Sequence, residues 1–453
     1  MKKYDVIVIG GGEGASLAFR AAEKGLKTAL IEKKDAGGTC LNVGCVPSKT
    51  LIFSADRLME IREAAKLGVK AEITKIDFDF IMKRMRKNVA TGRNFLKEAI
   101  GETENLDFYH KEARFSDEHV LDVSGEKIRG EKIFIATGSR PVIPPIRGLD
   151  KVDYLTSESV LKLRELPGSM IIIGGGYVGV EYAHFFAAMG TEVTVVELGS
   201  RLVSREEPEM SDLLRKKLEK RMAIHTGSQA VEVRKNRGKY VLAAREKRSG
   251  KSLELRAREI MVAAGRRSNA DILNVQAAGI GTDRNGYIKV DAFLRTGRKN
   301  IWACGDAIGR QMFTHAADKE VEIAWHNATG TGKIKMDFDL VPHVVFSYPQ
   351  IASVGLTESA ARKNYTILVG RAAYSDIVTG DAMAEESGFA KAVVEKTSRK
   401  ILGFHIIGPY ASFIIQEVVN AMANKQSVES ITSPMHTFPT LPELVPEVLG
   451  RLK

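Results

Sequence analysis

The chain has 453 residues, of which 44% are hydrophobic and 27% charged, and it contains three cysteines. This composition is typical of soluble globular proteins, and the length allows about three domains. Three cysteines are too few for a secreted disulfide framework, and no stretch is apolar enough for a membrane span, so we expect a cytoplasmic protein. The net charge is +11, but the basic runs at 83–87 and 245–251 lack interleaved aromatic residues, so no nucleic-acid partner is expected.

The first chemically informative stretch, residues 4–33, has the predicted order strand, glycine turn, helix, strand. Gly10, Gly12 and Ala15 match the pattern G-x-G-x-x-G/A. The first glycine permits a tight turn, the second lets the backbone approach a pyrophosphate, and the small third residue lets the helix pack on the strand. Glu32, which ends the second strand, is placed to bind a ribose hydroxyl. The stretch therefore predicts a dinucleotide-binding unit.

A second unit of the same kind spans residues 170–197 and ends in the acid Glu197. Its pattern positions are Gly174, Gly176 and Gly179. Two framed units predict two dinucleotides, or one flavin and one nicotinamide dinucleotide. Glu197 would repel a 2′-phosphate, which favours NADH over NADPH, whereas the nearby Arg201 is of a type that can accommodate that phosphate.

Cys40 and Cys45 lie close together in the stretch GGTCLNVGCVPSK, residues 37–49. They can be structural thiols, zinc ligands, a nucleophile with a bystander, or a redox disulfide; no further Cys/His cluster supports zinc. Residues five apart in a regular helix are about 8.6 Å apart at Cα, and a disulfide needs less than about 7 Å. A bonded pair therefore requires irregular backbone, which Gly44 can supply, while Pro47 fits the first turn of a following helix. A helix N-terminus there would lower a thiolate pKa.

This stretch resembles the active-site signature of the class I pyridine nucleotide–disulfide oxidoreductases, which include dihydrolipoamide dehydrogenase, glutathione reductase and mercuric reductase. Segments 133–141 and 260–269 resemble the places where the family's chain passes between nucleotide domains. Segment 300–307 resembles the second FAD motif, in which we expect Cys304 to be an apolar filler. Segment 344–355 resembles the start of the dimerisation domain.

The resemblance implies an α/β fold with two Rossmann-like domains, for FAD and NAD, and a C-terminal α+β dimerisation domain. The implied divisions are 1–147 and 270–335 for FAD, 148–269 for NAD and 336–453 for the interface of a homodimer. It also implies an enzyme in which hydride passes from NADH to flavin N5 and the flavin reduces a Cys40–Cys45 disulfide. Cys45 would be the flavin-side thiol and Cys40 the interchange thiol, with Lys49 and Glu181 paired beside N5.

The cofactor contacts implied by the resemblance fall into two sets, and no metal site is expected. For FAD they are Gly10, Gly12, Gly14, Glu32, Lys33, Gly38, Thr39, Lys49, Ala113, Thr137, Gly138, Asp306 and Ala316. For NADH they are Gly174, Gly176, Tyr177, Gly179, Glu197 and Gly265. Tyr177 resembles the glutathione reductase tyrosine that covers the nicotinamide pocket; packing in the first helical turn is the alternative.

The C-terminal stretch MHTFPTLPE, residues 435–443, departs from the family pattern. Dithiol-handling members have a histidine directly before the proline, whereas this chain has Phe438; Glu443 stands where the orienting carboxylate is expected, and His436 is not at the catalytic place. Phenylalanine carries no proton, and general acid–base catalysis contributes about 10²–10⁴-fold. Three hypotheses therefore stay open: a dihydrolipoamide dehydrogenase-like disulfide oxidoreductase, small-molecule or protein-bound in substrate; a reductase of a metal ion such as Hg(II) or Cu(II), quinone or oxygen; and a flavoprotein that docks to a larger complex.

Overall fold

The computed structural model describes residues 1–453, which divide into two compact units. Unit 1 comprises Met1–Thr50, Met82–Val142 and Gly265–Phe338; unit 2 comprises Leu51–Ile81, Ile143–Ala264 and Asp339–Lys453. The predicted division into three domains is finer than this one and stays a prediction.

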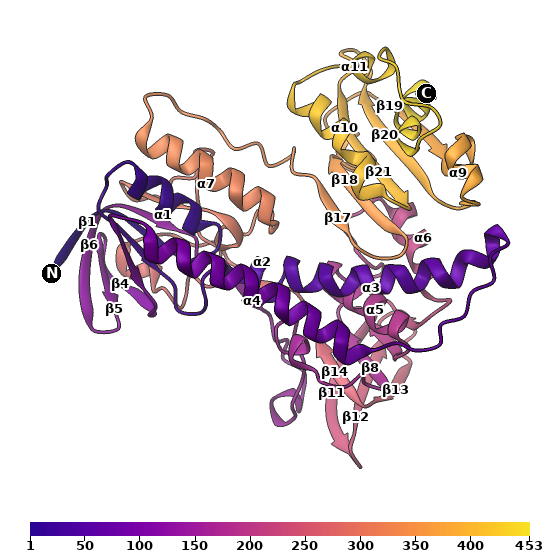
Figure 1. Ribbon diagram of the computed structural model, residues 1–453, viewed down its shortest axis with the longest axis horizontal. Coiled ribbons are helices and arrows are strands. Elements are labelled where there is room, and N and C mark those ends of the chain that lie inside the picture. The colour runs from indigo at the N-terminus through magenta and orange to yellow at the C-terminus, as the bar shows by residue number, and fades with distance from the viewer. The chain divides into compact units, whose positions relative to one another are not determined.

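Unit 1 is built on a sheet in the order β3-β2-β1-β6-β5-β4, with β16 also paired to β6 (Figure 1). The strands of this sheet are β1 (Lys2–Ile9), β2 (Thr28–Ile31), β3 (Leu106–Tyr109), β4 (Ala113–Asp117), β5 (Val120–Val123), β6 (Glu126–Ile135) and β16 (Ile301–Ala303). A separate pair is β7 (Ser139–Pro141) with β15 (Arg266–Ser268). β1 pairs in parallel with both β2 and β6, so the carboxyl ends of these strands meet at one edge, where ligands bind in open α/β sheets.

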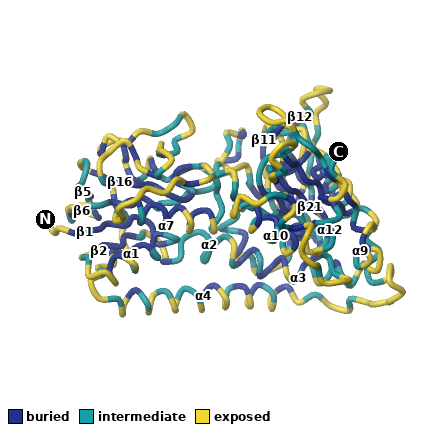
Figure 2. Tube along the Cα trace, turned by 90° about the horizontal axis from the view of Figure 1, so that it is seen from above, coloured by how far each residue is buried: buried dark blue, intermediate teal, exposed yellow.

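The helices of unit 1 cover this sheet because their small or apolar residues face it. The helices are α1 (Gly14–Glu23), α2 (Gly38–Val43) and α7 (Thr314–Thr329), with the first residues of α3 (Cys45–Glu63) and most of α4 (Phe78–Glu102). α1 buries Leu17, Ala18 and Ala21 and packs on β1 and on α7 (Figure 1). α4 buries Met82 and Met85 while one side of it stays exposed (Figure 2), as an amphipathic helix does.

Unit 2 contains three sheets. The first is parallel, in the order β10-β9-β8-β14, and consists of β8 (Ser169–Ile173), β9 (Glu192–Val196), β10 (Ala223–His225) and β14 (Glu259–Val262). The second is antiparallel and consists of β11 (Ser228–Asn236), β12 (Lys239–Glu246) and β13 (Ser252–Ala257). The third, in the order β17-β18-β21-β20-β19, consists of β17 (His343–Val345), β18 (Gln350–Gly355), β19 (Ile367–Ala373), β20 (Phe389–Glu395) and β21 (Ile401–Gly408).

The helices of unit 2 are distributed between these sheets. They are α5 (Tyr177–Met189), α6 (Pro208–Leu218), α8 (Glu358–Ala361), α9 (Val378–Ala382), α10 (Ala411–Ala423), α11 (Glu429–Thr432) and α12 (Leu444–Gly450). α5 packs on β8 and β9, α10 on β18 and β21, and α12 on β19 and β20. Phe404 and Val418 are fully buried in one core between the third sheet and its helices. The predicted α/β class, with two strand–turn–helix–strand units and a C-terminal α+β part, is therefore confirmed.

Candidate active site

The first glycine turn of unit 1 leaves backbone where a side chain would otherwise stand. Gly10 has φ +113°, and a Cβ there would lie 2.1 Å from the carbonyl oxygen of Ala136. Gly38 has φ +55°, and its Cβ would lie 2.7 Å from the Cα of Gly12. Both positions therefore require glycine, and the bare backbone lies directly before α1, which begins at Gly14. This is the arrangement that admits a pyrophosphate at a helix N-terminus.

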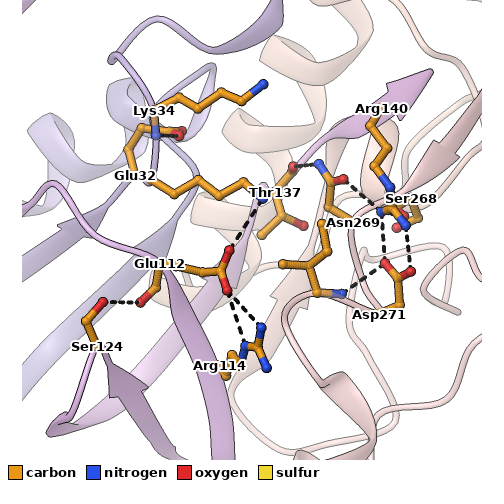
Figure 3. A network of polar contacts seen from close by, with 12 residues as sticks. Glu32, Lys34, Glu112, Arg114, Ser124, Thr137, Arg140, Ser268, Asn269 and Asp271 are labelled. Carbon is orange, nitrogen blue, oxygen red and sulfur yellow. Dashed lines mark hydrogen bonds and ion pairs between the residues drawn. The ribbon is translucent and has the colours of Figure 1, made fainter. Parts of the chain in front are cut away.

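Glu32 follows β2 and is held by two backbone amides. Gly11 N donates to Oε2 at 2.8 Å and Lys34 N donates to Oε1 at 2.8 Å. Figure 3 shows the Glu32 and Lys34 pair. Each carboxylate oxygen keeps a further lone pair, so the side chain is oriented and can still accept a ribose hydroxyl. Lys33 lies 3.8 Å from Glu112, the residue before Ala113, so these predicted cofactor residues belong to one neighbourhood.

The turn after β6 and the segment after β16 also meet in unit 1. The hydroxyl of Thr137 is buried without a hydrogen-bond partner, and Gly138 follows it with φ +65°. The carbonyl of Thr137 accepts from Asn269 Nδ2 at 2.8 Å (Figure 3). Ser139 Oγ donates to Asp306 Oδ2 at 2.5 Å, and Arg266 Nε lies 3.6 Å from the same oxygen.

The two close cysteines flank a break between helices. Cys40 lies in α2, Gly44 ends that helix with φ −126° and ψ −109°, and Cys45 begins α3. The predicted irregularity at Gly44 and the place of Pro47 in the first turn of α3 are therefore confirmed. The two residues are thiols here, so the disulfide stays a prediction.

The two thiols interact with each other and with α7. A hydrogen bond with Cys45 and, second, burial raise the pKa of Cys40. The expectation of a lowered thiolate pKa is therefore wrong for Cys40, because the N-terminus of α3 begins at Cys45 and not at Cys40. Cys45 Sγ lies 3.2 Å from the hydroxyl of Thr314, the first residue of α7, which also carries the buried Ala316. Cys304 is buried and its burial raises its pKa, as expected of an apolar filler.

The predicted lysine–glutamate pair is divided between the units. Lys49 belongs to unit 1, in the first turns of α3, and Glu181 to unit 2, in α5. Glu181 is 7% exposed, and its Oε1 accepts from the backbone amide of Phe346 at 3.1 Å. Pairing of the two side chains stays a prediction, as do the roles of Thr39 and Gly265, which both lie in unit 1.

The second glycine turn, in unit 2, repeats the geometry of the first. Gly174 has φ +115°, and a Cβ there would lie 2.3 Å from Ala263 O. A Cβ on Gly179 would lie 1.9 Å from Gly174 O, whereas Gly176 has open space, as a residue that faces a ligand requires. Glu197 Oε2 accepts from Gly175 N at 2.5 Å, which matches the way that the first unit holds its acid.

Tyr177 is the first residue of α5 and is anchored by a buried carboxylate that the sequence did not indicate. Its hydroxyl donates to Glu206 Oε1 at 2.7 Å, and its ring stacks on His343 with centroids 5.9 Å apart. Glu206 also accepts from His343 Nε2 at 3.0 Å and from Ser353 Oγ at 2.6 Å. Burial alone would raise the pKa of Glu206, but these donors outweigh it and lower that pKa.

The C-terminal segment in unit 2 carries no proton donor at the predicted place. Phe438 is 69% exposed. Glu443 Oε2 accepts from the backbone amide of Thr440 at 2.8 Å, which caps a short 3₁₀ turn. His436 is bonded to Glu417 at 3.0 Å. The residues of this segment are therefore engaged in local contacts, apart from the exposed ring of Phe438.

Comparison with protein-family models identifies the chain. The model described as "Pyridine nucleotide-disulphide oxidoreductase" matches residues 4–328, and that of the same family's dimerisation domain matches residues 341–449. The chain belongs to the pyridine nucleotide–disulphide oxidoreductase family. The dimerisation domain supports the predicted homodimer. No helix is both long enough and apolar enough to cross a membrane.

Relatives in this family have several different substrates in their names. A dihydrolipoyl dehydrogenase of Chlamydia trachomatis is 34% identical over 97% of this chain and 95% of its own length. A mycothione reductase of Mycobacterium tuberculosis is 34% identical over the full length of both chains, and a mercuric reductase of Lysinibacillus sphaericus is 32% identical over 97% of this chain and 81% of its own. The Cu(II) complex of the HOCl-induced flavoprotein disulfide reductase RclA from Escherichia coli matches with a TM-score of 0.88 and 30% identity, over 99% of each chain.

The chain is therefore a flavin-dependent oxidoreductase of the disulphide oxidoreductase family, and members of this family use FAD and NAD(P)H. The residues of unit 1 fit FAD: the glycine backbone before α1 has room for a pyrophosphate, and the buried unpartnered hydroxyl of Thr137 has capacity for a ligand bond. Sequence reasoning missed Ser139, Arg266 and Thr314, because their partners are more than 120 positions away in the chain. Only the helix start at Thr314, after the second FAD motif, gave a local signal.

Proposed function

We propose that this protein is an NADH:disulfide oxidoreductase in which Cys40 and Cys45 are the redox pair. The observation that carries the proposal is the placement of two hydrogen-bonded thiols on either side of the α2–α3 break, in the same unit as the glycine turn that fits FAD. For a disulfide acceptor, each turnover consumes one NADH and one proton and yields NAD⁺ and two thiols. When bound, the flavin supplies hydride acceptance and two-electron transfer to a disulfide.

The chain's own residues prepare this exchange. Cys45 stands at the first position of α3, where the helix dipole stabilises a thiolate, and Thr314 offers it a hydroxyl at 3.2 Å. The raised pKa of Cys40 keeps that thiol protonated at neutral pH, so it holds a proton that a departing substrate thiolate needs. Glu13 lies close enough for its charge to raise the pKa of Cys40 further.

NADH rather than NADPH is the proposed electron donor. The carboxylate of Glu197 is fixed by Gly175 N and by Gly199 N, both at 2.5 Å, and would repel a 2′-phosphate on the ribose that it binds. Steady-state kcat/KM with each nucleotide tests this; a preference for NADPH would refute it.

A second candidate function is reduction of a non-thiol acceptor by the same enzyme. Phe438 supports it, because a phenylalanine ring offers no general acid or base for dithiol exchange. The RclA structure with Cu(II) makes that ion the first metal acceptor to assay, with Hg(II), a quinone and oxygen beside it. Quinone or oxygen reduction that survives Cys40→Ser would favour this function.

An acceptor screen with FAD-loaded enzyme separates the two functions. The screen compares lipoamide and other small disulfides with the non-thiol acceptors, in wild type, Cys40→Ser and Cys45→Ser. The matched control is Cys304→Ser, since this thiol is buried 1% exposed and lies outside the pair. Disulfide reduction that needs both Cys40 and Cys45 supports the first proposal; disulfide reduction that either serine variant retains contradicts it.

A further inference from the structure

The loop between β9 and α6 is pinned to the second glycine turn at two places. At its start, Glu197 accepts from Gly175 N and Gly199 N, both at 2.5 Å. Farther along, Val203 N donates to Gly175 O at 2.8 Å. Arg201 lies between these two points, so its Cα is fixed near the residue that we propose binds the adenosine ribose.

The guanidinium of Arg201 is held by an aspartate of the next helix. Arg201 Nε donates to Asp212 Oδ1 at 2.9 Å, and Nη2 lies 3.5 Å from Asp212 Oδ2. Asp212 stands in α6, and the two side chains are 46% and 58% exposed. The pair uses the Nε–Nη2 edge, one of the edges with which arginine binds phosphate in a fork. An arginine engaged in this way has to give up a carboxylate before it can bind a 2′-phosphate by that edge.

We propose that Asp212 is a specificity-determining residue that keeps Arg201 from serving a 2′-phosphate and so selects NADH. The inference rests on the proposed function, because it assumes that Glu197 marks the adenosine ribose. It explains how a chain can place an arginine four residues after the ribose acid without accepting NADPH. Asp212 acts through Arg201, and its own negative charge adds repulsion of the phosphate.

The test is a double-mutant cycle of Asp212→Asn, Arg201→Gln and the double variant. The probes are adenosine 2′,5′-bisphosphate and AMP, whose dissociation constants are measured by calorimetry on the FAD-loaded protein, followed by kcat/KM for NADPH and NADH. Asp212→Asn should tighten the bisphosphate relative to AMP about fivefold, the range that an exposed ion pair supplies. In the Arg201→Gln background the same change should have an effect below about twofold, because no arginine is released.

The control is Glu219→Gln, which removes the same charge from the residue after α6 and frees Arg215, its partner at 2.7 Å. It should leave the bisphosphate-to-AMP ratio as in wild type. An equal gain from Asp212→Asn with and without Arg201 would overturn the inference, since simple charge removal would then explain it, and so would no gain at all. A wild-type enzyme that prefers NADPH would contradict the proposed donor, a result read from the wild type alone and separate from the cycle.

Discussion

Replacing Lys391 with methionine would remove the only cation from a cluster of carboxylates inside unit 2. Its ammonium group lies 3.0 Å from Glu207, 2.7 Å from Glu209 and 2.8 Å from Glu358. The side chains of Lys391 and Glu207 are 6% and 2% exposed. These bonds join β20, the start of α6 and the start of α8, so the cluster ties the loop region after β9 to the third sheet.

The expected cost follows from the burial of Glu207. Methionine has a similar length and apolar volume, so the main loss is the charge that compensates a buried carboxylate, which costs about 3–5 kcal/mol. At about 2–4 °C per kcal/mol for a unit of this size, the apparent Tm of unit 2 should fall by roughly 6–20 °C. The control Lys319→Met removes an exposed pair with Glu322, 58% and 52% exposed, and should change stability by less than about 1 kcal/mol.

The pH dependence of this cost has a fixed sign. Bonds with Lys391 lower the pKa of Glu358 below its ordinary 4.5, and they outweigh burial in lowering that of Glu209. Carboxylates with a lowered folded pKa add stability above about pH 4.5 and lose it as the pH falls through the folded pKa. Burial alone would lower the pKa of Lys391, but its three partners raise it, so its contribution is complete at neutral pH.

Calorimetric scans of wild type and Lys391→Met at pH 7 and at pH 4 check both points. The difference in Tm should be large at pH 7 and smaller at pH 4, where the carboxylates begin to take up protons. A Lys391→Met variant that unfolds within 2 °C of the Lys319→Met control at pH 7 would refute the argument, and so would a difference that grows as the pH falls.

Three further predictions concern the proposed activity. Phe438→His should raise turnover of lipoamide about 10²-fold, the lower end of general-base catalysis, because Glu443 keeps a carboxylate oxygen beyond its bond to a backbone amide; stopped assays with wild type beside it check this, and an unchanged rate would mean that the segment does not reach the thiols. Thiol counting in denaturant should give one thiol, Cys304, in air-oxidised protein and three after reduction, and three before reduction would exclude the Cys40–Cys45 disulfide. Sedimentation at assay concentration should show a dimer with an interface of about 2,000 Å² or more, and an active monomer would contradict it.

The nucleotide-binding units were determined by the sequence itself. Gly10 and Gly174 have φ values of +113° and +115° and face a backbone oxygen at close range, so only glycine fits, and this constraint is local enough to be read from the pattern. The break at Gly44 was predictable for the same reason, since five residues of regular helix cannot bring two sulfurs together. The exposed Phe438 needed no structure to be recognised as a ring without a proton to give.

Only the tertiary structure decided which partners these residues have. Arg201 counted as a phosphate ligand until Asp212, eleven residues on, was found at its guanidinium. Tyr177 is anchored by Glu206, and Cys45 meets Thr314, which is 269 residues away. A hydrogen bond between side chains so distant in the chain leaves no periodicity or spacing, because its geometry arises only when separate elements pack together. Composition and motifs therefore determine the turns and the chemistry, while packing decides which charges and hydroxyls remain available for a ligand.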